Sequence, residues 1–231
     1  ENKGSETTEN EKKDDTKEPE TKDDEKKEES TEPSGDVIVA KIATVGPLTG
    51  DQAQYGQQAK AATEIAISHW NEKNVQADGK TVQFEIAAYD DAGKVDEAAA
   101  IAEQIVADKD IVAVASGHHA SSICLVACPT YQNAGLVSIT NAASHPDYAK
   151  IGSYVLRNNI TDLGEARNSI QMLYRMGYHK IAIAAPETDF GVSAAENAQN
   201  CVKEVIDAGG KDFECVGAEF YTQPCDDYTP V

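Results

Sequence analysis

Short runs of apolar residues alternate with helix-like stretches along most of the chain. The runs are nearly continuous and rich in Val, Ile and Ala, which is typical of strands that are buried on both faces. Successive strand–helix units predict a doubly wound α/β fold, in which helices cover both faces of a parallel sheet. The expected strands are residues 37–45, 81–89, 111–115 and 136–140, and the expected helices start at Gln57 and span 96–106 and 121–133.

The strand–helix rhythm restarts after a short expected strand at residues 154–157, which indicates a second α/β lobe. We therefore expect a first lobe at residues 36–156 and the N-terminal part of a second lobe at 157–231. Two parallel strands do not make an independently stable sheet, so we expect an incomplete second lobe and a chain that is a fragment of something longer. The second lobe is expected to hold a helix that includes Leu163 and Leu173, a strand at 180–185, a helix at 194–206 and a strand at 213–219.

Residues 1–35 contain no hydrophobic residue and carry −7 of the formal net charge of −20, which leaves −13 for the remainder. Ordering a backbone costs about 1–2 kcal/mol per residue, and this segment has no apolar area to offset that cost, so we expect a disordered, charged tether. The acidic remainder argues against nucleic acid and anionic lipid as partners. A charged tether before a compact domain is what remains when an exported protein loses its signal peptide, so we expect membrane attachment only through a lipid-modified cysteine just upstream.

The cysteines do not show the paired short spacings of a zinc site. We expect them to be small buried hydrophobic residues and expect no metal, while their disulfide state stays open. The five cysteines are Cys124, Cys128, Cys201, Cys215 and Cys225.

Three turns are expected at the carboxyl ends of first-lobe strands, where ligands bind in open α/β sheets. They span residues 46–56, 117–122 and 140–144. In the second turn, Ser121 lies at or near a helix N-terminus, where free N–H groups and the helix dipole favour an anion. Ser144 and the backbone around Ala142 follow the next strand, and Tyr55 offers an aromatic wall. These residues predict a site for a small anion.

Each of these residues also has a purely local interpretation. Ser121 is suited to cap its own helix, Ser144 to cap the turn before Pro146, and Tyr55 to belong to the core. Adjacent His118 and His119 would face different ways in a regular element, so we interpret them as loop residues that do not take part. The pair Asp90 and Asp91 is interpreted as structural, at the end of the second strand.

Catalytic and cofactor-binding signatures are absent from the sequence. It has no GxSxG nucleophile elbow, no GxxxxGK[ST] phosphate loop and no GxGxxG after the first strand, where it reads VGPLTGDQAQYG. We therefore expect no catalytic residue, no cofactor and no enzyme activity. A serine hydrolase that uses Ser121 with His118 or His119 is kept as a weaker alternative.

Five sequence blocks occur in order between residues 41 and 158: KIATVGPLTGDQAQYGQQAKAATEIAISHWNEK, YDDAG, ADKDIVAVASGHHASS, GLVSITNAASHP and YVLRN. In order and spacing they resemble the branched-chain amino-acid receptors of the type I periplasmic binding protein family. The resemblance covers residues 37 to about 231 and ends before the family's full length.

The resemblance implies a two-lobed clamshell that captures an amino acid between lobes and delivers it to an ABC transporter permease. The family's ligand-carboxylate contacts fall on Ser121, Ala142 and Ser144, and its aromatic contacts fall on Tyr55 and on Phe190, where the family has a tyrosine in a loop. A cysteine pair of some members is replaced here by Gly93 and Ala120. The family's acidic partner for the ligand's ammonium group lies beyond Val231.

From this we expect an extracytoplasmic receptor, monomeric and lipid-anchored at the cell surface or in the periplasm, for an amino acid of the branched-chain or aliphatic type. A sensory or regulatory ligand-binding domain of the same fold is the alternative. We expect residues 1–231 alone to bind ligand poorly, because half of the cleft would be missing.

Overall fold

The computed structural model describes residues 36–222, so the expected tether at residues 1–35 and Cys225 lie outside the described residues. The described residues belong to one compact unit, within which the described strands make two separate sheets. No helix in the described part of the chain is long and apolar enough to cross a membrane.

The first sheet has six strands in the order β2-β3-β1-β4-β5-β6. All neighbours are parallel except β2 and β3, which form an antiparallel hairpin. The chain leaves β1 toward β3 on one side and returns to β4 on the other, which makes the sheet doubly wound, as predicted. The bounds are β1 Val37–Gly46, β2 Gln76–Ala77, β3 Lys80–Asp90, β4 Ile111–Gly117, β5 Val137–Thr140 and β6 Val155–Arg157.

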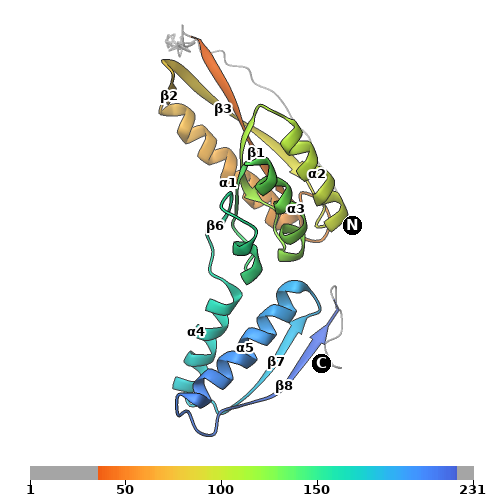
Figure 1. Cartoon of the computed structure of the whole chain (residues 1–231), viewed down its shortest axis with the longest axis vertical. Coiled ribbons are helices and arrows are strands. Elements are labelled where there is room, and N and C mark those ends of the chain that lie inside the picture. Colours follow the sequence, from red (N-terminus) through yellow and green to blue (C-terminus); the bar gives the residue numbers. More distant parts are fainter. Residues whose placement is uncertain (1–35, 223–231) are drawn as a thin grey trace, which may run out of the picture. The chain divides into compact units, whose positions relative to one another are not determined.

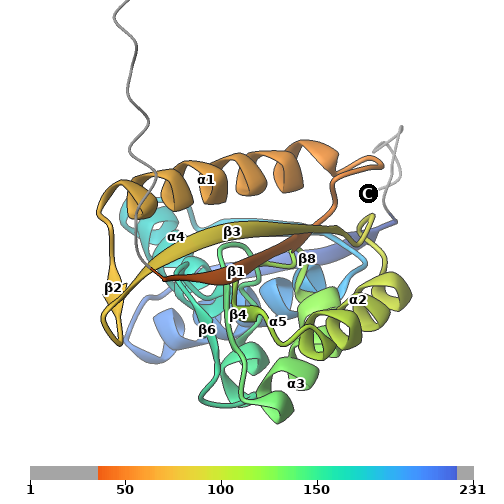
Figure 2. The same cartoon turned by 90° about the horizontal axis from the view of Figure 1, so that it is seen from above.

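Helices cover both faces of this sheet. Figure 2 shows α1 (Ala53–Glu72) on one face and α2 (Val95–Ala107) with α3 (Ser121–Ala134) on the other. The α2 and α3 side holds the main core, which includes Ile105, Ile123 and Tyr131. This core fixes α3, and therefore the turn that precedes it, against the sheet (Figure 1).

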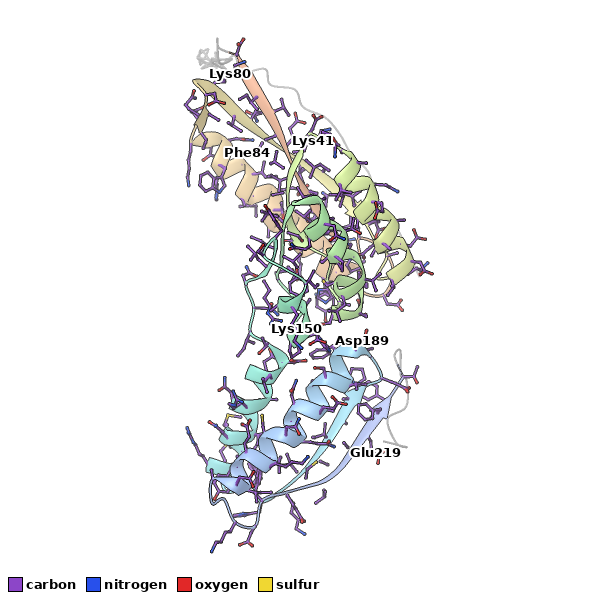
Figure 3. All side chains as sticks on the ribbon, in the orientation of Figure 1. Lys41, Lys80, Phe84, Lys150, Asp189 and Glu219 are labelled. Atoms are coloured by element: carbon purple, nitrogen blue, oxygen red, sulfur yellow. The ribbon has the colours of Figure 1, made fainter. Side chains whose placement is uncertain are left out.

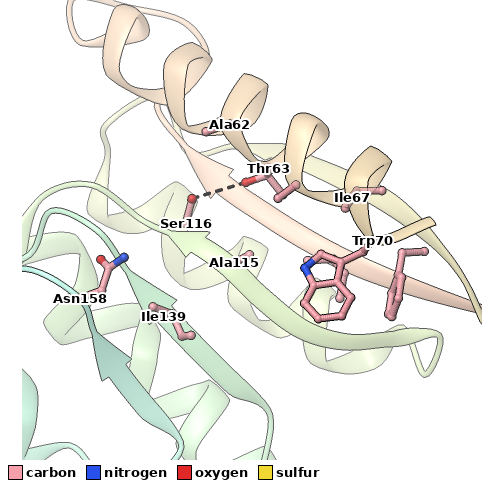
Figure 4. Close-up of a pocket in the computed structure, with 11 residues that line it drawn as sticks. Ala62, Thr63, Ile67, Trp70, Ala115, Ser116, Ile139 and Asn158 are labelled. Atoms are coloured by element: carbon pink, nitrogen blue, oxygen red, sulfur yellow. Dashed lines mark hydrogen bonds between the residues drawn. The ribbon is translucent and has the colours of Figure 1, made fainter. Parts of the chain in front are cut away.

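The α1 face of the sheet is more open. Trp70 near the C-terminal end of α1 is 51% exposed, and the buried residues of the helix are Gly56 and Thr63. Beside α1 lies an apolar groove of about 510 Å³ between the helix and the sheet (Figure 4). Thr63 Oγ1 lies 3.4 Å from Ser116 Oγ at this groove.

The second sheet consists of β7 (Lys180–Pro186) and β8 (Glu214–Tyr221), which are parallel as predicted. Helices α4 (Asp162–Arg175) and α5 (Asp189–Asp207) contact each other and share a small core with the sheet. A short 3-10 helix, η1 (Pro146–Lys150), precedes β6.

Two helices begin earlier than their apolar patterns predict. Helix α1 begins at Ala53 rather than Gln57, and α5 begins at Asp189, labelled in Figure 3, rather than at residue 194. In α5 the reason is a cap, because the Thr188 hydroxyl accepts a hydrogen bond from the Gly191 N–H at 3.1 Å. Phe190 therefore lies in the first turn of a helix, not in the loop that the sequence analysis expected.

The four described cysteines are free. Cys124 and Cys128 belong to the first core and Cys201 to the second, while Cys215 is half-buried. The prediction that cysteines serve as small buried hydrophobic residues is thus confirmed for the first three.

Candidate functional site

The turn between β4 and α3 has an unusual backbone. Ser116 and His118 both have positive φ, at 53° and 44°, a region that residues other than glycine seldom adopt. Between them, a Cβ atom at Gly117 would stand 2.9 Å from Ser138 Oγ, so a side chain there would press on the neighbouring strand. The turn is therefore tight, and it directs His118 and His119 to different surroundings.

His118 points into the core. Its Nδ1 lies 2.8 Å from Oδ2 of Asp91 and its Nε2 lies 3.0 Å from the Tyr131 hydroxyl oxygen. All three side chains are buried, and burial raises the pKa of Tyr131. This chain of contacts ties the turn to α3 and to the end of β3. His118 lies in a loop, as interpreted from the sequence, and its contacts with Asp91 and Tyr131 anchor that loop.

The neighbouring carboxylate holds the loop after β1. Oδ1 of Asp90 accepts hydrogen bonds from the N–H groups of Leu48, Thr49 and Ala92 at 2.8, 3.3 and 2.8 Å, and Oδ2 accepts one from the Thr49 hydroxyl at 2.6 Å. Asp91 also accepts a bond from the Gly93 N–H at 2.9 Å. These bonds agree with the structural role expected for both aspartates.

A cavity of about 290 Å³ opens beside the N-terminus of α3. It is smaller than the groove along α1, but hydroxyl, amide and imidazole groups meet in it, whereas the groove is mostly apolar. We therefore take the smaller cavity as the candidate site. Its lining residues are Gln52, His119, Ala120, Ser121, Ser122, Ala142, Ser144, Pro186, Thr188 and Phe190.

Ser121 is the first residue of α3 and is 4% exposed. The structure shows no side-chain cap at this helix, whose N-cap residue is Ala120, so Ser121 does not cap it. Its Oγ accepts a hydrogen bond from the His145 N–H at 3.3 Å. The hydroxyl hydrogen has no acceptor among residues 36–222 and is available to a ligand oxygen.

The loop after β5 supplies Ala142 and Ser144. The Ala142 N–H donates to Thr140 Oγ1 at 3.3 Å, and its carbonyl accepts from the Asn159 amide at 2.9 Å. The carbonyl of buried Ser144 accepts from the Asp162 N–H at 3.1 Å. Both bonds to residues after β6 fix this loop at the cavity.

Residues from the turn between β7 and α5 complete the lining. Phe190 is 40% exposed and provides the aromatic surface. The Thr188 hydroxyl already accepts the capping bond from Gly191. This side of the cavity is therefore mainly apolar, with Pro186 beside Phe190.

Tyr55 does not line the cavity. It is 53% exposed and stacks on His119, with ring centroids 4.7 Å apart and planes inclined by 11°. His119, which the sequence analysis set aside, does line the cavity. Burial lowers the pKa of His119, and the charge of Asp91 opposes this more weakly.

The sequence analysis missed Gln52, His119, Ser122 and Thr188 as lining residues. Gln52 and Ser122 are polar neighbours of predicted site residues in the same turns. A search of whole turns, rather than of hydroxyl groups at expected caps, could have found them.

Two α/β units with polar groups gathered at the carboxyl ends of their strands form the arrangement in which open α/β folds bind small ligands. The chain belongs to the periplasmic binding protein family, whose sequence model matches residues 39–231.

Among the relatives with this similarity is the Leu/Ile/Val-binding protein of Citrobacter freundii, which is 29% identical over 197 residues. The Leu/Ile/Val/Thr-binding protein of Salmonella typhimurium is 30% identical over 197 residues. In both cases the match covers 80% of this chain. It covers 52% of the length of the Citrobacter freundii protein and 53% of the length of the Salmonella typhimurium protein. The chain thus spans about half the length of these relatives.

Solved structures show the same fold. A solute binding protein of an ABC transporter from Rhodopseudomonas palustris, in complex with 3,4-dihydroxy benzoic acid, has a TM-score of 0.70 and 23% identity, covering 84% of this chain and 50% of that one. A branched-chain amino acid transporter substrate binding protein from Streptococcus pneumoniae, in complex with isoleucine, has a TM-score of 0.67 and 20% identity. The match covers 83% of this chain and 52% of that one. The predicted fold, and an incomplete second lobe, are thereby confirmed.

Proposed function

We propose that this protein is an extracytoplasmic receptor that captures a small amino acid of the branched-chain or aliphatic type and delivers it to an ABC transporter. The observation that carries the proposal is the position of Ser121, a buried hydroxyl at the N-terminus of α3 and on the wall of a small cavity. Relatives named for Leu, Ile and Val binding support the same ligand class.

The geometry favours a carboxylate at the α3 end of the cavity. The N–H groups of the first helical turn have no partner within the helix, and the helix dipole is positive there. The Ser121 hydroxyl adds a donor, and Ser144 lies on the same wall. At about 290 Å³ the cavity is at the small end of ligand sites, which suits an amino acid.

The lobes of the receptor are proposed to be residues 36–156 and 157–231, with closure over the ligand as the binding motion. Tyr55 acts in this proposal through His119, whose ring it supports, and Phe190 covers the ligand from the other side. We further propose a monomer held to the membrane by an N-terminal lipid anchor.

A serine hydrolase is less well supported. A nucleophilic serine needs a base within hydrogen-bonding distance. Within residues 36–222, no hydrogen bond joins the Ser121 hydroxyl to a histidine ring, and His118 is engaged by Asp91 and Tyr131. A sensory domain of the same fold would use the same cavity, and no feature of the described residues favours it over transport.

Calorimetry on the intact protein tests the proposal. L-leucine should bind with one ligand per chain, whereas leucinol, which lacks the carboxylate, should bind at least about 100-fold more weakly, because charged hydrogen bonds are lost. Equal affinities for the two compounds would place the ligand's carboxylate elsewhere.

A further inference from the structure

The described wall of the candidate cavity contains few of the side chains that normally surround an aliphatic group. Among residues 36–222, no Leu, Ile, Val or Met lines it. Its apolar surface comes from Phe190, Pro186 and two alanines, and polar side chains form the rest. A purely aliphatic ligand would therefore leave polar groups of the wall without partners, which is costly in a closed site.

His119 is the polar group that is best held in place. The Tyr55 ring lies against one face of its imidazole, at 4.7 Å and 11°. Its backbone follows His118, which is locked by Asp91 and Tyr131. A side chain held in this way loses little further freedom when it binds a ligand.

The His119 ring nitrogens are also unused. No hydrogen bond to them is found in the described part of the chain, although the ring lines the cavity. Burial lowers the pKa of His119, which favours the neutral imidazole. A neutral imidazole has one donor and one acceptor, which suits a hydroxyl group.

Resting on the proposed function, we infer that His119 contacts the side chain of the bound amino acid and makes the site prefer a side chain with a hydroxyl group. Threonine and valine provide the comparison, because they have nearly the same shape and differ by a hydroxyl in place of a methyl group. The carboxylate and ammonium contacts are common to both, so His119 should affect the ratio of their affinities.

Calorimetry on the intact protein measures this ratio with L-threonine and L-valine. Wild type should bind threonine about 2- to 12-fold more tightly, which is the range for the net contribution of one hydrogen bond. His119→Phe keeps a ring to stack on Tyr55 but has no ring nitrogen, so it should abolish or reverse the preference. His119→Gln keeps a donor and an acceptor and should retain part of it.

Several results would overturn the inference. One is a ratio of threonine to valine affinity that is the same in His119→Phe as in wild type. Another is an equal loss of affinity for threonine and valine in His119→Phe, which would place His119 against the carboxylate or ammonium group that both ligands share. Wild type that prefers valine would also overturn it, while leaving the proposed receptor function intact. If neither these amino acids nor leucine bind, the proposed function fails and the inference fails with it. Thermal melting of each variant checks that it is folded. If His119→Phe does not fold, the threonine-to-valine affinity ratio of His119→Gln tests the inference instead.

Discussion

The backbone of Gly191 lies directly against the carbonyl group of Pro186, so that a Cβ atom at Gly191 would overlap the Pro186 oxygen. Gly56 stands in the same relationship to Pro47. In both cases the first turn of a helix packs on a proline where a strand ends: Pro186 is the last residue of β7, and Pro47 directly follows β1. At Gly191 this contact sets the positions of Thr188 and Phe190 at the cavity.

Replacing Gly191 with alanine should lower the free energy of unfolding by about 1–3 kcal/mol, because the added methyl group forces α5 away from Pro186 at the end of β7. Urea unfolding measures this. Gly217→Ala in β8 is the control, since no atom lies within 4 Å of its added Cβ, and it should be neutral or stabilising by about 0.4–1 kcal/mol. Equal losses for both variants would contradict the close contact.

Asp91→Ala should destabilise the protein by about 3–5 kcal/mol, because it removes the buried partner of His118 Nδ1. Chemical denaturation gives the value. Asp207→Ala, at the exposed C-terminal end of α5, is the matched control and should change stability by less than about 0.5 kcal/mol. If Asp91→Ala is as mild as the control, the buried pair does not anchor the turn.

Ser121→Ala should weaken amino-acid binding by about 1–3 kcal/mol, because one donor to the carboxylate is lost. Titration calorimetry on the intact protein with L-leucine measures the change. Ser153→Ala replaces an exposed serine and should bind like wild type. An unchanged affinity in Ser121→Ala would remove Ser121 from the site.

Asp90 should make stability depend on pH in the acid range. Burial alone raises the pKa of Asp90, but the bonds from the Thr49 hydroxyl and three backbone N–H groups together lower it. A carboxylate with a depressed pKa in the folded state stabilises the protein above its unfolded pKa of about 3.8. That contribution is lost as the pH falls through the lower, folded pKa.

The comparison of wild type with Asp90→Asn isolates this effect. Wild type should be the more stable protein at pH 7, and the difference should shrink as the pH is lowered below about 4. Denaturant titrations over a series of pH values measure the difference, in which the titration of other carboxylates cancels. A difference that does not depend on pH would mean that Asp90 holds the loop without its charge.

Local patterns in the sequence were sufficient for the longer strands and their parallel pairing, but not for the two-residue β2 and its antiparallel pairing with β3. Runs such as residues 111–115 are continuously apolar, and this pattern predicted a strand of a parallel sheet without any tertiary information, although Val112 is 51% exposed in the structure. The helix starts were harder, because α5 begins at a cap from Thr188 and not at its first apolar repeat. Apolar periodicity reports the buried face of a helix and not its first turn.

At the candidate site, too, the sequence predicted some features, and only the tertiary structure decided the others. That His118 and His119 would face different ways follows from their adjacency, and the position of Ser121 at a helix start follows from the end of a strand pattern. The partners of the two histidines do not follow, because Asp91 and Tyr55 lie on other elements and meet them only when the sheet has formed. Contacts between residues distant in the sequence depend on packing, so only the tertiary structure could assign one histidine to the core and the other to the cavity.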